Sequence, residues 1–356
     1  MSVKGIFAEK VSKMMFLELK LERIKDIFGV EVVENVYMPI RSSRMIDKIK
    51  AGDNFETIPV DLFIEGMFYI LGADREFKYN NSYKIILNTR YNDFIRYIKG
   101  IIFKEAQKEE YEEAYIMLKG LISMENNKEN FHKLFLLAER LRLNNKDYEL
   151  EELAMIEEAK NIQGYSAPYL YEAIIKNKNK DFAASLECIN RYIAFGGEQT
   201  VEVLDLKHNL ENIKIYDKGK ELLYKKPKEA LKYFLSLIDE FQDDAILLYN
   251  IAIAYRIVNN HEKAIYYLNE ALAIDSDLVE VVNELGINYA ALGDYKTSEA
   301  YLRKAFEVTK SVEICTNLIM CYINMGNLKQ AKLHLNIAEK INPEDEIVIQ
   351  LKEMLR

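Results

Sequence analysis

The chain of 356 residues has little of the chemistry on which metal and redox sites depend. It contains no tryptophan, four histidines and three cysteines. The histidines are scattered, and none has a cysteine or a carboxylate at ligand spacing, so the sequence predicts no metal site and no cofactor. The cysteines, Cys188, Cys315 and Cys321, show no paired spacing, which is typical of a protein in a reducing compartment.

Long apolar runs and excess positive charge are also missing. The longest apolar run, residues 62–73, contains Glu65 and is too short to span a bilayer, and the first ten residues lack the uncharged stretch of a secretory signal. A net charge of −9 disfavours non-specific binding to nucleic acid. We therefore expect a cytoplasmic protein that neither inserts into a membrane nor binds nucleic acid. Abundant Lys, Ile and Asn without tryptophan favour an AT-rich bacterial source.

The known catalytic motifs fail on residue identity, so the sequence predicts that the protein is not an enzyme. His261-Glu262 begins like a zinc-protease helix but lacks the second histidine. Residues 164–168 carry Pro168 where a nucleophile elbow needs glycine, and no phosphate-binding glycine loop is present. The charged groups are interpreted as solvated surface: Glu109-Glu110, Glu112-Glu113, Glu151-Glu152, and the basic group Arg41, Arg44, Lys48 and Lys50.

The last third of the chain carries a repeat instead. Tyr255, Tyr289 and Tyr322 lie 34 and 33 residues apart, which predicts equivalent environments for them. Three more columns share these offsets: Ala264, Ser298 and Ala331; Leu268, Leu302 and Leu335; Ala271, Ala305 and Ala338. In each unit apolar residues recur at intervals of three and four on both sides of a polar turn, which indicates two helices. This register resembles the tetratricopeptide repeat.

The resemblance implies an all-α fold, a right-handed α-solenoid of helical hairpins. We expect regular repeats over 213–356, with a short first helix before the turn at Lys226-Pro227 and a capping helix over 344–356. Degenerate repeats are expected over 96–212, as a second helix from Glu110 and two hairpins over 138–153 and 173–193. Residues 195–210 interrupt the spacing and are interpreted as a linker or an extra helix.

Residues 1–95 do not fit the repeat and are predicted to form a mostly helical cap. Ala8–Phe28 has the pattern of one amphipathic helix that ends at Gly29. Val30–Met38 has the β-branched composition of an extended segment, and Pro59 begins a second apolar helix that runs to Gly72.

In proteins of this family the first helix of each hairpin lines a concave groove. The residues predicted to bind a peptide there are Tyr249, Asn250, Ile253, Arg256, Ile257, Asn283, Glu284, Ile287, Asn317, Met320 and Asn324. Carboxamides can bond a peptide backbone, and Ile253, Ile287 and Met320 can receive apolar side chains. The basic pairs that clamp a terminal carboxylate in chaperone-binding members are missing, since Glu280 and Glu313 stand at those positions.

The predicted function is a protein–protein interaction scaffold that binds a protein or peptide through this groove. One alternative is a peptide-sensing regulator, in which a short ligand changes how the cap engages a target. A second is an enzyme subunit with its site in residues 1–95, a region without any histidine or cysteine. The partner and the oligomeric state stay open.

Overall fold

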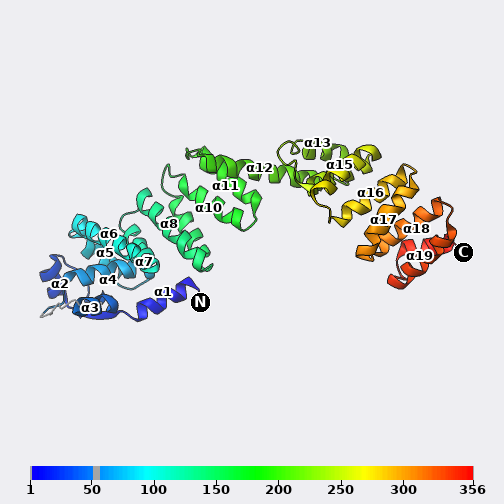
Figure 1. Ribbon diagram of the computed structural model, residues 1–356. Helices are drawn as coiled ribbons and strands as arrows, with labels where there is room; N and C mark the ends of the chain where they lie inside the picture. Colours follow the sequence, from blue (N-terminus) through cyan, green and yellow to red (C-terminus); the bar gives the residue numbers. More distant parts are fainter. Residues whose placement is uncertain (1, 51–56, 356) are drawn as a thin grey trace. The chain divides into compact units, whose positions relative to one another are not determined.

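The computed structural model describes residues 2–50 and 57–355, and within these residues it consists of paired helices and one small sheet (Figure 1). The chain divides into two compact units, Met1–Lys207 and His208–Arg356. The division falls within the long helix α12, Val201–Leu222. Across the described residues, none of the helices combines the length and the hydropathy needed to cross a bilayer.

The first unit begins with a short mixed segment in which β1 (Met15–Leu19) pairs antiparallel with β2 (Val36–Ile40), Leu17 lying opposite Met38. The helices here are α1 (Val3–Ser12), α2 (Leu21–Phe28), α3 (Ser42–Lys50), α4 (Val60–Ala73) and α5 (Asn80–Asn88). The single helix predicted for Ala8–Phe28 is therefore wrong. The extended segment predicted for Val30–Met38 includes only the first three residues of β2.

Pairing with β2 explains why β1 departs from the helical pattern. Val36, Met38 and Ile40 are buried and form a continuous apolar row, and the strand offers β1 a full ladder of backbone hydrogen bonds. Such tertiary pairing overrides the local period of the apolar residues. The predicted helix ends are confirmed, because Gly29 closes α2 in the left-handed region at φ 70° and Pro59 precedes α4.

Helix α4 is the centre of this unit and is buried from Leu62 to Gly72. It crosses α7 (Tyr111–Ile122) at two glycines that let the backbones touch. A Cβ on Gly72 would lie 1.8 Å from the Ile116 carbonyl oxygen, and a Cβ on Gly120 would lie 1.8 Å from the Phe68 carbonyl oxygen. Only residues without a side chain fit such a crossing.

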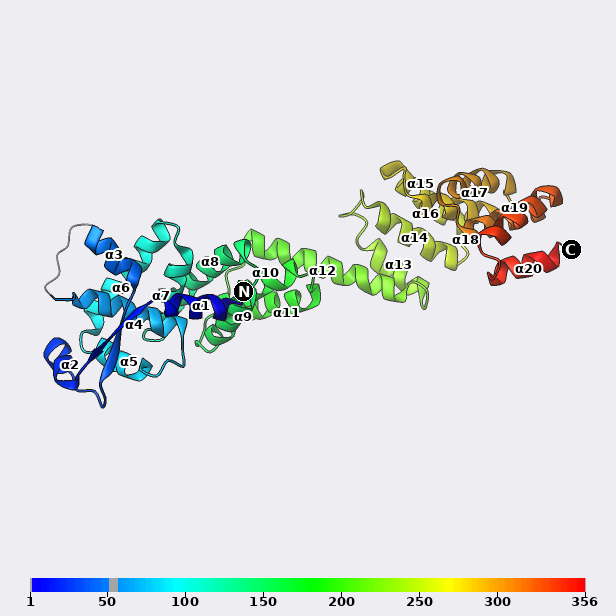
Figure 2. The same ribbon diagram turned by 90° about the horizontal axis from the view of Figure 1, so that it is seen from below.

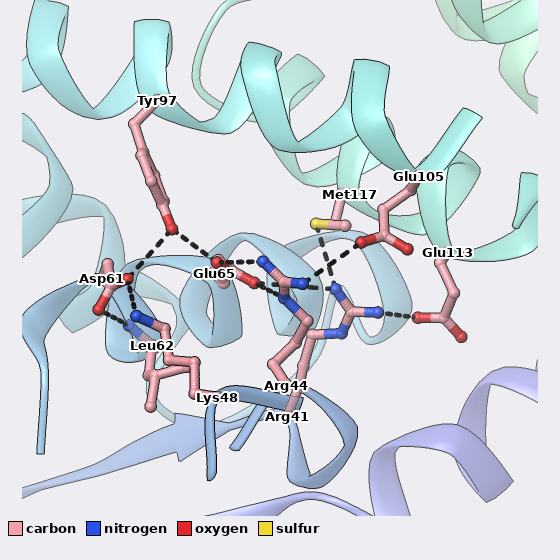
Figure 3. Close-up of polar contacts among 10 residues, drawn as sticks. All are labelled: Arg41, Arg44, Lys48, Asp61, Leu62, Glu65, Tyr97, Glu105, Glu113 and Met117. Carbon is pink, nitrogen blue, oxygen red and sulfur yellow. Dashed lines mark hydrogen bonds and ion pairs between the residues drawn. The ribbon is translucent and has the colours of Figure 1, made fainter. Parts of the chain in front are cut away.

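The basic group predicted to be solvated instead ties α3 to the rest of the unit (Figure 3). The Arg44 guanidinium donates to Glu65 at 2.7 Å, and Arg41 donates to Glu113 at 2.6 Å. Glu65 has no exposed surface, and Arg41 is buried. Lys48 pairs with Asp61 at 2.8 Å. Charges this deeply placed need partners, so the solvated-surface interpretation is wrong for Arg41, Arg44 and Lys48, whereas Lys50 is exposed.

The solvated-surface interpretation is also wrong for some of the acidic residues. Glu152 is fully buried and accepts a hydrogen bond from Arg142 at 2.7 Å, while Glu151 pairs with Lys119. Glu113 is mostly buried, and the charges of Arg41 and Lys10 hold its pKa below the ordinary value although burial opposes them. These acids join neighbouring helices rather than face water.

Three hairpins complete the first unit and include the second helix predicted from Glu110 and the two hairpins predicted over 138–153 and 173–193. They are α6 (Tyr91–Gln107) with α7, α8 (Lys128–Asn144) with α9 (Tyr148–Ala159), and α10 (Ala167–Lys178) with α11 (Phe182–Ala194). The extra helix that was one of two interpretations of residues 195–210 is the first half of α12. Because α12 has 22 residues, the prediction of a short first helix before Lys226-Pro227 is wrong.

The second unit continues the hairpins and confirms the predicted all-α solenoid of helical hairpins. After α13 (Pro227–Leu235) come α14 (Ala245–Ile257) with α15 (His261–Ile274), α16 (Val279–Ala291) with α17 (Tyr295–Thr309), α18 (Val312–Asn324) with α19 (Leu328–Ile341), and α20 (Glu346–Met354). The helix expected over 344–356 corresponds to α20, and Arg356 lies outside the described residues. Asn259, Gly293 and Gly326 take positive φ between the paired helices, as the turn requires.

Two of the three tyrosines in the column have equivalent environments. The Tyr255 ring stacks on Tyr267 at 5.5 Å between centroids, and the Tyr289 ring stacks on Tyr301 at 5.6 Å. Tyr322 instead lies tilted against His334, because the column that supplies Tyr267 and Tyr301 supplies a histidine in the third repeat. The predicted equivalence is therefore wrong for Tyr322.

The apolar side chains of the second unit form two cores. One core runs from Leu223 to Leu285 and the other from Val282 to Leu355. Helix α16 contributes to both, since Leu285 belongs to the first core and Val282 to the second.

Candidate functional site

The predicted binding residues lie on α14, α16 and α18, which are the first helices of three successive hairpins and contact one another in order (Figure 2). Residues one repeat apart on these helices form columns, because the hairpins stack with the same register. We call the accessible part of these columns the first-helix face: Tyr249, Asn283, Ile287, Asn317, Met320 and Asn324.

The structure places the predicted residues at three depths. Met320 and Asn324 are exposed, and Tyr249, Arg256, Ile257, Asn283, Ile287 and Asn317 are half-buried. Asn250, Ile253 and Glu284 are buried. The prediction that these three lie on the exposed side of their helices is therefore wrong.

Asn250 holds two hairpins together. Its amide nitrogen donates to the Tyr216 hydroxyl of α12 at 2.9 Å and to the Ile246 carbonyl one turn back at 2.9 Å. Both N–H groups of the carboxamide are thus used within the protein, which leaves none for a ligand backbone.

Glu284 occupies the position one repeat after Asn250 and faces Arg256 of the preceding repeat, with 2.7 Å between the arginine Nε and the carboxylate oxygen. The two atoms are close but are not aligned as a hydrogen bond. Burial raises the pKa of Glu284, and the charge of Arg256 opposes that shift. The pair joins α14 to α16 below the surface and contributes to stacking rather than to a ligand site.

Two of the accessible polar groups of the face are neighbouring carboxamides on α16 and α18. The Asn317 amide nitrogen lies 3.5 Å from the Asn283 side-chain oxygen, which is at the limit of a hydrogen bond, so most of the bonding capacity of both groups is unused. Tyr249 stands one repeat before Asn283, and burial raises its pKa to about 12, so its hydroxyl is a neutral donor at pH 7. Ile287 and Met320 lie one turn further along the same helices.

Exposed residues at the start of each first helix were not predicted as part of the site. Ile246, Glu280 and Glu313 are exposed and lie three or four residues before Tyr249, Asn283 and Asn317 respectively. Spacing of three and four places residues on one helix face, so the periodicity alone could have found them.

The described residues contain no cluster of three or more histidines, cysteines or acids that could hold a metal ion. The three cysteines are free and buried. Burial raises the pKa of Cys188 to about 12 and of Cys315 to about 11, so these thiols stay protonated. They pack as small apolar groups and offer no activated nucleophile.

Comparison with known families identifies the hairpins. The family model described as "Tetratricopeptide repeat" matches residues 245–278 and 279–311, which hold α14–α15 and α16–α17. Residues 245–311 therefore contain two tetratricopeptide repeats, which confirms the resemblance found in the sequence for this part of the chain. A comparison with curated proteins finds no relative.

Several solved structures are similar in fold. The MamA protein is 16% identical, with 49% of this chain and 90% of that chain covered and a TM-score of 0.37. TTC0263, a thermophilic TPR protein from Thermus thermophilus, is 20% identical over 53% of this chain and 98% of its own, with a TM-score of 0.34. YrrB, whose structure is described as a TPR protein with an unusual peptide-binding site, is 17% identical over 57% and 97%, with a TM-score of 0.38.

Proposed function

We propose that the second unit binds an extended segment of a partner protein across the first-helix face. The observation that carries this proposal is the neighbouring pair Asn283 and Asn317, whose carboxamides are accessible and little used within the protein, beside the apolar side chains of Ile287 and Met320. Carboxamides that both donate and accept suit a peptide backbone, and neighbouring apolar groups suit the side chains that the backbone carries.

The charge of the face favours a neutral or basic segment. Glu280 and Glu313 are exposed at the start of α16 and α18, and Glu284 lies beneath them against Arg256. An acidic segment would meet like charge here, which disfavours the complex. We infer that specificity comes from Tyr249, Ile287 and Met320, with the acids selecting against acidic partners.

Replacing both carboxamides should weaken binding without affecting folding. In Asn283→Ala/Asn317→Ala, each lost hydrogen bond leaves a buried peptide group unpaired at ~1–3 kcal/mol, so the affinity for the partner should fall roughly 30-fold or more. The free energy of unfolding should change by less than about 0.5 kcal/mol, because the contact between Asn283 and Asn317 is long and lies near the surface. The measurement is calorimetric titration with a segment mapped from a partner captured by the full chain.

A matched control replaces two exposed asparagines on second helices, Asn269→Ala/Asn336→Ala on α15 and α19. This variant should bind the segment as tightly as the unmodified chain. Equal affinity of both double variants and the unmodified chain would exclude the first-helix face as the binding site.

We infer a cytoplasmic setting and a role without catalysis. Three buried free thiols suit a reducing compartment, and the net charge of −9 disfavours nucleic acid as the partner. The polar groups that the first-helix face offers are carboxamides, a neutral phenol and acids, which suit binding of a peptide rather than nucleophilic chemistry.

A further inference from the structure

The two outer edges of the β1–β2 sheet differ. The outer edge of β2 is covered by helices: a Cβ on Gly66 of α4 would lie 1.9 Å from the Pro39 carbonyl oxygen, and the Tyr83 hydroxyl of α5 donates to the Tyr37 carbonyl oxygen. Pro39 has no N–H group to satisfy. On that edge of β2 the Tyr37 carbonyl oxygen is therefore paired, the Pro39 carbonyl oxygen is covered by α4, and Pro39 has no N–H group.

The same contacts reveal which backbone groups β1 presents outward. In an antiparallel ladder, pairs that exchange two hydrogen bonds alternate with pairs whose N–H and C=O groups point away from each other. Tyr37 and Pro39 direct their carbonyl groups outward, so the pairs Glu18↔Tyr37 and Phe16↔Pro39 are of the second kind. The N–H and C=O groups of Phe16 and Glu18 consequently point to the outer side of β1.

No other backbone segment in residues 2–50 and 57–355 pairs with that side. The sheet has two strands. Within these ranges no group outside the sheet forms a hydrogen bond with the backbone of Phe16 or Glu18. The side chains of Met15, Phe16 and Leu17 are 42%, 36% and 40% exposed. Natural edge strands are usually protected by proline, lysine or a bulge, and β1 has none of these.

An aromatic cluster lies against the face of the sheet that carries Phe16 and Tyr37. The Phe16 ring stacks on Phe77 with 5.6 Å between centroids, and the Tyr37 ring lies 5.8 Å from Tyr79. These rings are partly exposed and offer an apolar shelf to every second side chain of a strand added next to β1. Glu18 is the one charge within β1, and its carboxylate accepts from Asn35 at 3.2 Å.

We propose that β1 is a docking edge at which an extended segment of a partner protein adds a third strand. An extended backbone supplies the alternating acceptors and donors that Phe16 and Glu18 require, and apolar residues at alternate positions suit the Phe16–Phe77 shelf. A second copy of this chain is the weaker occupant, since an edge of five residues buries far less than the ~1,200 Å² of a stable interface. This site lies in the first unit and does not depend on the proposed function of the second.

The test uses Glu18→Pro, which removes one outward N–H group, with Glu18→Ala as the matched control that keeps it. A displayed library of random dodecapeptides is selected on the full chain, and enriched peptides are synthesised and titrated against each variant. We expect enriched peptides to alternate apolar and other residues. Their affinity for Glu18→Ala should be within about threefold of their affinity for the unmodified chain. Their affinity for Glu18→Pro should be at least about tenfold weaker, because a peptide carbonyl group loses its N–H donor in this variant.

A second measurement does not depend on whether the proline variant folds. Methylating the peptide nitrogens that face β1 should abolish binding to the unmodified chain, while methylating the alternate nitrogens should not. The proposal is overturned if no peptide is enriched, or if both sets of methylated peptides bind equally. It is also overturned in favour of a second copy if the unmodified chain sediments as a dimer that Glu18→Pro dissociates.

Discussion

Gly120→Ala should lower the free energy of unfolding of the first unit by at least about 3 kcal/mol. The new methyl group would stand 1.8 Å from the Phe68 carbonyl oxygen, a backbone atom that cannot rotate away. Helices α4 and α7 must therefore separate, and the buried contacts along α4 must open with them. Urea unfolding followed by circular dichroism, with hydrogen exchange of the α4 and α7 amides, measures the effect.

Gly100→Ala is the matched control, since it makes the same chemical change in α6. A Cβ there meets no atom within 4 Å, so the variant should gain about 0.5–1 kcal/mol from the lower entropy of its unfolded chain. If Gly120→Ala were as stable as Gly100→Ala, the close crossing of α4 and α7 would be refuted.

Glu65→Gln should destabilise the first unit by about 3 kcal/mol. Glu65 is fully buried and accepts hydrogen bonds from Arg44 at 2.7 Å and from the Tyr97 hydroxyl at 2.6 Å (Figure 3). The neutral amide removes the closest counter-charge of Arg44 and leaves it the longer contact with Glu105, 3.9 Å from Nη1 to the carboxylate oxygen. The poorly compensated buried charge costs more than the net gain of the original pair. Thermal and urea unfolding at neutral pH measure the loss.

Two controls separate charge from shape in this cluster. Glu129→Gln removes an exposed partner of Lys133 and should change the free energy of unfolding by less than about 0.5 kcal/mol. The double variant Arg44→Met/Glu65→Leu removes both charges and should recover part of the stability that Glu65→Gln loses. A double variant less stable than Glu65→Gln would show that the pair itself, not the unpaired charge, dominates.

The hairpins could be predicted because each depends on short-range pattern. Small residues such as Ala264 and Ala271 recur where two helices approach, and both are fully buried in the structure. Turn residues that accept positive φ, such as Gly293 and Gly326, recur with the same spacing. The hairpins α14–α15, α16–α17 and α18–α19 all repeat these constraints, so errors at single positions do not change the fold.

The start of the chain could not be predicted in the same way. Residues 15–19 agree with a helix locally, and only β2, about twenty residues later, makes them a strand. The basic group presents the same difficulty, because Arg41 meets Glu113 across 72 residues of sequence. Composition indicates charge, but only tertiary contacts decide whether that charge is solvated.

The candidate site was predictable in position but not in residue detail. Asn250 and Asn317 have the same side chain on equivalent helices, yet Asn250 is bonded to Tyr216 and Asn317 stays accessible. The difference comes from the preceding repeat, which places a tyrosine 34 residues before Asn250. Asn317 has Glu284 at the corresponding place in the preceding repeat, so the sequence itself distinguishes the two asparagines.

The dual membership of α16 affects how the second unit loses its structure. Leu285 belongs to the core that begins at Leu223, and Val282 belongs to the core that ends at Leu355. Unfolding of either core exposes one side of α16, which also packs in the other core. The other core is then destabilised. The interface energy between neighbouring repeats therefore couples the unfolding of the two cores.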